Sequence, residues 1–259
     1  MLVVMSAGQV VNPVDCQLTT TESGLQIREM IHPNDYAEPL ILRHLKLEIG
    51  STPYMNSSDN DELLYILDGD CSIEISQGGE LSNYSLATGS AVQVLGGSQW
   101  RFMSADNVSA LSFLVPAPPG PWAQALAKPT QPVVNVTKLG AQVAESATSD
   151  RQFEVLFNAE RGSRGATMFV GFIPTSGAPE HYHIYDEICV IVRGSGAVHT
   201  LGIKQELGVG SAFHVAPRLL HAIENPNPDD LWLLGVFRPE GSAAAAYYPD
   251  GRPAPNNED

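Results

Sequence analysis

The chain has 259 residues, of which 43% are hydrophobic and 17% are charged. This apolar content suffices for one large core or two small ones and excludes bulk disorder. A formal net charge of −15 without any run of Lys or Arg argues against nucleic acid or an anionic membrane surface as partner, so we expect a small-molecule substrate.

Residues 1–24 are expected to form an N-terminal arm. Residues 1–11 are fairly apolar but contain no basic residue, and a polar stretch, 12–15 (NPVD), follows them. This is not the pattern of a signal peptide, and no stretch approaches the ~20 apolar residues of a membrane span. Cys16, Cys71 and Cys189 fit no CxxC spacing, so we expect reduced thiols and a cytoplasmic protein.

An internal repeat organises the rest of the chain. Residues 61–69 (DELLYILDG) match residues 186–194 (DEICVIVRG), and residues 89–92 (GSAV) match residues 210–213 (GSAF) at nearly the same offset. A fixed offset between similar segments indicates two copies of one structural unit. The predicted boundaries are 25–118 for the first unit, 119–148 for a linker, 149–241 for the second unit and 242–259 for a loose tail.

Short apolar runs fill both units. They are rich in β-branched and aromatic residues and end at Gly, Pro, Asn or Asp, and the 23 glycines and 19 prolines are typical of many turns. No segment has a convincing helical period. The sequence therefore predicts an all-β chain with two similar barrels or sandwiches.

The histidines gather in the second unit. His181 and His183 are two residues apart, so an extended strand presents them on one face. Glu187 is an even number of residues further on, so in a continuous strand it lies on the same face. His221 lies on a later strand that can close over the same face. Three imidazoles and a carboxylate suit Fe(II), Mn(II), Zn, Ni or Cu, and burying them without a metal would leave polar atoms unpaired at ~1–3 kcal/mol each.

The other four histidines are interpreted as ordinary core or surface residues, because none belongs to this spaced set. They are His32, His44, His199 and His214.

At these residues the sequence resembles the cupin superfamily. The first cupin motif, G-x5-HxH-x3,4-E-x6-G, is matched by His181, His183, Glu187 and Gly194, and the second, G-x5-PxG-x2-H-x3-N, by Pro217, His221 and Asn225. One departure is Leu219, where the second motif usually has glycine; this changes a turn and leaves the ligand set intact.

With the internal repeat, the chain resembles a bicupin. The resemblance implies two tandem jelly-roll barrels joined by a short linker. It also implies one divalent transition metal per chain in the C-terminal barrel, with iron as first choice and Mn, Ni, Zn or Cu as alternatives. The implied ligands are His181, His183, Glu187 and His221.

The N-terminal copy departs from the metal motif. Superposing the Asp-Glu pairs and the Gly-Ser-Ala segments places Asn56, Ser58, Glu62 and Trp100 where the second copy has His181, His183, Glu187 and His221. One carboxylate without imidazoles does not form a transition-metal site. We therefore expect a barrel that has lost its metal and that packs against the second barrel, and against a second chain in a homodimer.

The reaction stays open at the level of sequence, because cupin metal sites support several chemistries. Our first hypothesis is a non-haem iron dioxygenase-type oxidoreductase acting on a small organic substrate, since Fe(II) keeps open positions for substrate and O₂. The alternatives are a metal-dependent isomerase, lyase or decarboxylase, and a non-catalytic metal-dependent binder of small ligands. An isomerase or lyase needs a proton carrier, for which Tyr185 and Glu224 are the nearest candidates.

Overall fold

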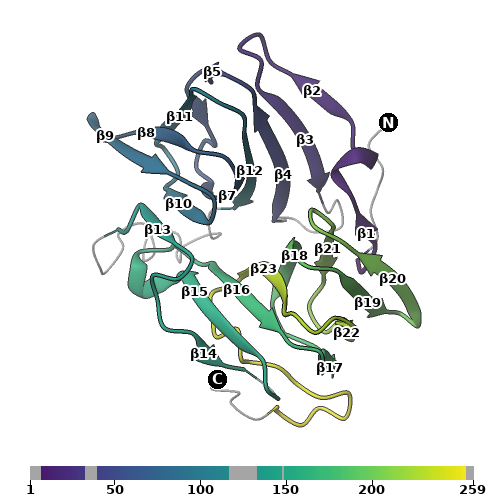
Figure 1. Ribbon diagram of the computed structural model, residues 1–259. Coiled ribbons are helices and arrows are strands. Elements are labelled where there is room, and N and C mark those ends of the chain that lie inside the picture. The colour runs from purple at the N-terminus through teal and green to yellow at the C-terminus, as the bar shows by residue number, and fades with distance from the viewer. Residues whose placement is uncertain (1–6, 33–39, 117–132, 148, 255–259) are drawn as a thin grey trace.

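The structure is a computed structural model that describes residues 7–32, 40–116, 133–147 and 149–254. It is nearly all-β, with two β-sandwiches that lie one above the other in Figure 1. The described ranges contain two short 3-10 helices, η1 (Pro13–Asp15) and η2 (Ala159–Arg161). No helix in these ranges has the length and apolar character needed to cross a bilayer.

The N-terminal barrel is built from two antiparallel sheets. The larger sheet has the order β13-β10-β7-β12-β4-β3-β2, and the smaller has the order β5-β11-β8-β9, with β6 also paired to β11. The strands are β2 (Leu18–Thr20), β3 (Gln26–Ile31), β4 (Ile41–Leu47), β5 (Gly50–Ser51), β6 (Met55–Asn56), β7 (Asp61–Asp68), β8 (Cys71–Gln77), β9 (Glu80–Leu86), β10 (Ser90–Val94), β11 (Gln99–Ser104), β12 (Val108–Val115) and β13 (Val136–Lys138).

The C-terminal barrel repeats this plan. Its larger sheet has the order β1-β21-β18-β23-β16-β15-β14, and its smaller sheet has the order β17-β22-β19-β20. The strands are β1 (Val10–Val11), β14 (Glu145–Ser146), β15 (Gln152–Phe157), β16 (Thr167–Ile173), β17 (Ala178–His181), β18 (Asp186–Arg193), β19 (Gly196–Thr200), β20 (Ile203–Leu207), β21 (Ala212–Val215), β22 (His221–Glu224) and β23 (Leu231–Arg238).

Each large sheet buries both of its faces. On β7, Leu64 and Ile66 point into the N-terminal barrel, whereas Leu63 and Tyr65 point toward the other barrel. The same alternation on β18 separates the interior of the C-terminal barrel from a shared core between the barrels. A strand that is buried on both faces has apolar residues at successive positions. This is why the residues that follow Glu62 on β7 and Glu187 on β18 are almost all hydrophobic.

Segments outside the two repeats tie the barrels together. β1 of the N-terminal arm pairs with β21 of the C-terminal barrel, and β13, which follows the N-terminal barrel in the chain, pairs back with β10. Across the interface, Nε of Arg164 donates to the Asp61 carboxylate at 3.0 Å. The segment expected as linker thus contributes β13 and β14 in its described part, while residues 117–132 and 148 lie outside the described residues.

The segment after β23 is packed rather than loose up to residue 254. Ala244, Ala245 and Ala246 are buried, and Tyr247 exchanges two backbone hydrogen bonds with Tyr182, of 2.9 and 3.0 Å. Tyr182 lies between His181 and His183, so this segment closes over the metal motif. Small side chains allow that close approach, and the sequence reading gave the alanine run no role.

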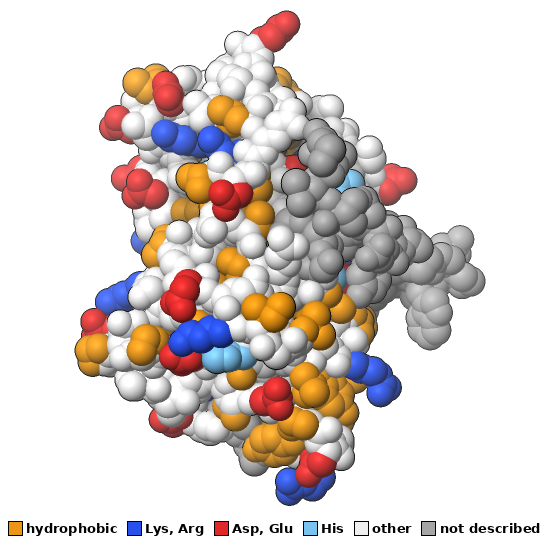
Figure 2. All heavy atoms as spheres, turned by 90° about the vertical axis from the view of Figure 1, so that its right-hand side faces the viewer, with side chains coloured by type: hydrophobic (Ala, Val, Ile, Leu, Met, Phe, Trp, Pro, Cys, Tyr) orange, Lys and Arg blue, Asp and Glu red, His pale blue; other side chains and the backbone are white. Residues whose placement is uncertain are grey.

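The surface agrees with the acidic composition. On the face shown in Figure 2, the Lys and Arg side chains lie among acidic ones and form no continuous basic strip. Hydrophobic side chains gather toward the lower end of that face. The charge of this face is therefore distributed rather than concentrated.

Candidate metal centre

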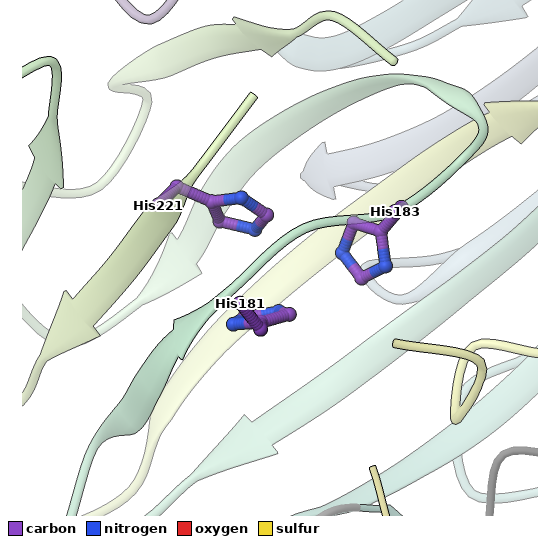
Figure 3. Close-up of side chains that lie close together, drawn as sticks. All are labelled: His181, His183 and His221. Atoms are coloured by element: carbon purple, nitrogen blue, oxygen red, sulfur yellow. The ribbon is translucent and has the colours of Figure 1, made fainter. Parts of the chain in front are cut away.

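Three histidines converge inside the C-terminal barrel. β17 and β22 pair so that His181 lies directly opposite His221, and His183 follows two residues beyond. The ring centroids are 4.3 Å apart for His181 and His221, 4.9 Å for His181 and His183, and 5.1 Å for His183 and His221. One ring nitrogen from each residue lies within 4.8 Å of the others, and Figure 3 shows the rings turned toward a common centre.

Backbone carbonyls fix the tautomer of each imidazole. Nδ1 of His181 donates to the carbonyl of Pro179 at 2.6 Å, Nδ1 of His221 to Leu219 at 3.0 Å, and Nδ1 of His183 to Ala245 at 3.0 Å. Because a carbonyl can only accept, each Nδ1 carries the proton and each Nε2 keeps its lone pair. Such hydrogen bonds from the remote nitrogen are the usual support of histidine metal ligands.

Burial keeps the imidazoles of His181 and His221 neutral. It lowers the pKa of His221 to about 3, with the charge of His183 as a second cause. Burial likewise lowers the pKa of His181 well below its ordinary value, with His221 and His183 adding to the shift. Metal ligands must be deprotonated, so this environment suits a cation and disfavours a proton.

Glu187 completes the donor set. It is buried on β18, and one carboxylate oxygen lies 3.4 Å from Nε2 of His183. On its other side is the Cys189 thiol, whose pKa is raised by burial first and by the Glu187 charge second. Three imidazoles that turn Nε2 toward one another and one carboxylate fit a divalent metal ion.

The two residues expected to carry protons have different positions. The ring of Tyr185 is stacked between Phe237, at 4.5 Å, and His183, at 6.3 Å. Its hydroxyl lies against Gly241, where a Cβ would come within 2.5 Å of it. Tyr185 therefore positions the ring of His183.

Glu224 lies outside the site. On β22 the side chains alternate, so His221 points inward and Glu224 points outward. Its carboxylate pairs with Nε2 of His199 and Nζ of Lys204, each at 2.9 Å. The expectation that Glu224 lies near the metal motif for proton transfer is wrong, because nearness in sequence placed it on the opposite face of the strand.

The remaining histidines have partners elsewhere. His214 faces away from the cluster and contacts Asp186 at 2.5 Å, although it lies on β21 next to β18. Nε2 of His44 is 2.8 Å from the Ser109 hydroxyl, and His32 is paired with Glu29. Their interpretation as ordinary core or surface residues agrees with these positions.

A small pocket of about 60 Å³ adjoins the metal centre. Most of its walls are aromatic or aliphatic side chains, among them Phe153, Phe169 and Phe213. Arg151 also lines it, and the charge of Arg151 contributes to the lowered pKa values of His181 and His221. The sequence motifs give no sign of Arg151, because it lies 30 residues before His181, immediately ahead of β15.

The N-terminal barrel has no counterpart of this centre among the residues that the structure describes. Trp100 is fully buried and donates its indole N–H to Glu62 at 2.8 Å. It pairs with Met55, as His221 pairs with His181, whereas Asn56 is exposed. The residue in the place of His181 is thus Met55, one position earlier than the sequence superposition indicates.

Comparisons with known proteins agree with this architecture. Residues 168–237 match the cupin domain family, and no curated protein sequence matches the chain. Solved structures of oxalate decarboxylase are similar. One comes from a study of the Mn(II) centres of the Bacillus subtilis enzyme, and another from a study of proton-coupled electron transfer in oxalate decarboxylase. Each is 13% identical and covers 92% of this chain and 79% of that one, with TM-scores of 0.70 and 0.72.

Proposed function

We propose that this chain, whose C-terminal barrel is a cupin domain, is a metal-dependent enzyme that acts on a small organic anion. The observation that carries the proposal is the placement of Arg151 in the same pocket as His181, His183, His221 and Glu187. A cation beside a metal site, within otherwise apolar walls, suits a substrate that presents a carboxylate.

Each group has a distinct task in this proposal. His181, His183, Glu187 and His221 hold the metal, which when bound supplies Lewis acidity or redox chemistry at the substrate. The guanidinium of Arg151 binds and orients the substrate carboxylate. The phenylalanine walls exclude water, which strengthens both interactions.

The first candidate reaction is a dioxygenase-type oxidation with iron as the metal. Among the lining residues that the structure describes, the groups able to carry a proton are the proposed ligands themselves and Cys189, whose pKa is raised. Isomerase chemistry needs a separate proton carrier near the substrate. An oxidation by O₂ would not depend on such a proton carrier.

The second candidate is a decarboxylation with manganese. Two observations favour it: Arg151 supplies a binding site for a carboxylate, and the similar structures are of a decarboxylase with Mn(II) centres. In this case the C–C bond to the carboxylate held near Arg151 breaks, the carboxylate leaves as CO₂, and the electron pair left on the neighbouring carbon takes up a proton from solvent water.

One experiment separates these reactions. Full-length protein is loaded with Fe(II) or with Mn(II) and incubated with a panel of small mono- and dicarboxylates while O₂ uptake and CO₂ release are recorded. Stoichiometric O₂ uptake with iron supports the oxidation, whereas CO₂ release without O₂ consumption supports decarboxylation. The variant Arg151→Met should raise KM at unchanged metal content, with Arg252→Met, at an exposed site, as the control.

A further inference from the structure

A second cavity lies between the barrels and has no part in the chemistry proposed above. It has a volume of about 510 Å³, within the range of about 300–1,000 Å³ that is typical of small-molecule sites. Tyr65 comes from the N-terminal barrel, while Glu154, Phe172 and Trp232 come from the C-terminal barrel. Its walls therefore depend on the packing of the two barrels against each other.

The floor of this cavity carries the hydroxyl of Tyr65. The Tyr65 side chain is only 4% exposed, and its hydroxyl makes no hydrogen bond within the described ranges of the chain. This oxygen is not one of the buried side-chain atoms that lack a partner, so it is reached from the cavity, where water or a ligand can hydrogen-bond to it. Burial, and after it the charge of the nearby Glu154 carboxylate, raise the pKa of Tyr65 to about 12. The Glu154 carboxylate accepts hydrogen bonds from the backbone amides of Gly140 and Gln142 at 2.8–3.0 Å.

The walls and the mouth have a different chemistry. Phe172 and Trp232 meet edge to face at 5.3 Å, and the Arg193 guanidinium lies 4.7 Å from the Trp232 ring centroid. Arg193 and Thr88 are exposed, so they mark the opening toward solvent. From the mouth inward the cavity thus offers a cation, aromatic surfaces, and then acceptor groups on the floor.

We propose that this inter-barrel cavity is a second ligand site, for a planar aromatic molecule with an acidic group at one end and an amine or hydroxyl at the other. The acidic group pairs with Arg193, the ring packs on Phe172 and Trp232, and the donor reaches Glu154 and Tyr65. The two sites adjoin at β16: Phe172 lines both of them, while its neighbours Gly171 and Ile173 line the metal pocket only.

The test uses 4-aminobenzoate as probe and isothermal titration of the full-length protein. Thr88→Trp places an indole at the mouth without touching the core and should abolish binding. The matched control is Val209→Trp, in the equivalent turn of the C-terminal barrel, where Val209 is 65% exposed; it should bind as the unmodified protein does. Cyclohexanecarboxylate, which lacks both the planar aromatic ring and the amine, should not bind.

Tyr65→Phe gives a second, independent readout. It should weaken binding of 4-aminobenzoate about fivefold, the equivalent of one hydrogen bond of about 1 kcal/mol. It should not lower the melting temperature of the ligand-free protein, because the Tyr65 hydroxyl has no hydrogen bond to lose among the residues that the structure describes. The proposal is overturned if the unmodified protein fails to bind at millimolar probe, or if binding survives Thr88→Trp but is lost in Arg151→Met, which would place the probe in the metal pocket.

Discussion

The two barrels place the same carboxylate in the same strand and use it differently. Glu62 and Glu187 both follow an aspartate at the start of the central strand, and both point into their barrel. Glu62 accepts hydrogen bonds from Ser57 and Ser112, each at 2.5 Å, and from Trp100. Glu187 faces imidazoles instead. The carboxylate of the first barrel is saturated by donors, whereas that of the second is placed to bind a cation.

This difference shows what a lost metal site needs in order to remain folded. A buried carboxylate without partners is costly, so the first barrel supplies hydroxyl and indole donors where the second supplies ligands. Trp100 also fills the space of the pocket, with Phe102 edge to face at 4.8 Å.

The largest expected effect is loss of the metal from the second barrel. His221→Ala removes a ligand whose neighbours cannot replace it, so bound metal should fall at least tenfold in elemental analysis after dialysis. His199→Ala, on the outer face near Glu224, is the matched control and should keep full occupancy. Equal loss in both variants would contradict the ligand assignment.

The two carboxylates should respond in opposite ways to the same change. Glu62→Gln should lower the free energy of unfolding by about 1–3 kcal/mol, because one of the three groups that donate to the carboxylate would then face the NH₂ group of the glutamine, which cannot accept. The metal content should stay unchanged. Glu187→Gln should lower metal affinity and alter stability less in the metal-free protein. Chemical denaturation and metal titration of both variants measure this; metal loss in Glu62→Gln would break the comparison.

The stability of the metal-free protein should depend on pH through the second barrel. The folded-state pKa of His221 is depressed to about 3, so between about pH 6.5 and 3 the unfolded chain binds a proton that the folded chain does not. Stability should therefore fall with falling pH, by about 1.4 kcal/mol per pH unit for each such histidine. Urea denaturation from pH 7 to pH 5 tests this, and metal-free His221→Ala should show a shallower slope; equal slopes would refute the assignment.

The smallest effects are expected at the two residues first considered for proton transfer. Tyr185→Phe keeps the ring stacked on His183, so metal affinity should change by less than the 10–100-fold typical of lost supporting groups. Glu224→Gln lies outside the barrel and should change neither metal affinity nor turnover. If the unmodified enzyme has a bell-shaped pH–rate profile and Glu224→Gln removes one limb of it, Glu224 takes part in proton transfer and the site assignment is wrong.

Much of the fold and the histidine set followed from local pattern. The repeat and the apolar runs predict two all-β barrels because strands buried on both faces must be continuously hydrophobic. The HxH spacing places His181 and His183 near each other, and the cupin resemblance adds His221 and Glu187. Homodimer formation and a cytoplasmic location stay predictions.

The misses have physical causes. Arg151 reaches the pocket only through the pairing of distant strands, which no local motif encodes. The packed segment after β23 contributes the Ala245 carbonyl to His183, and an alanine run carries no signal for such a backbone contact. Superposition of the repeats gave Asn56 in place of Met55, since a shift of one residue moves a side chain to the other face of a strand.

The most direct test of the central claim is a crystal structure of the full-length protein purified without chelator, with anomalous scattering recorded at the metal edge. The account predicts a single anomalous peak per chain, bounded by the Nε2 atoms of His181, His183 and His221 and by the Glu187 carboxylate. A peak in the N-terminal barrel near Glu62, or no peak after loading with Fe(II) and with Mn(II), would contradict it.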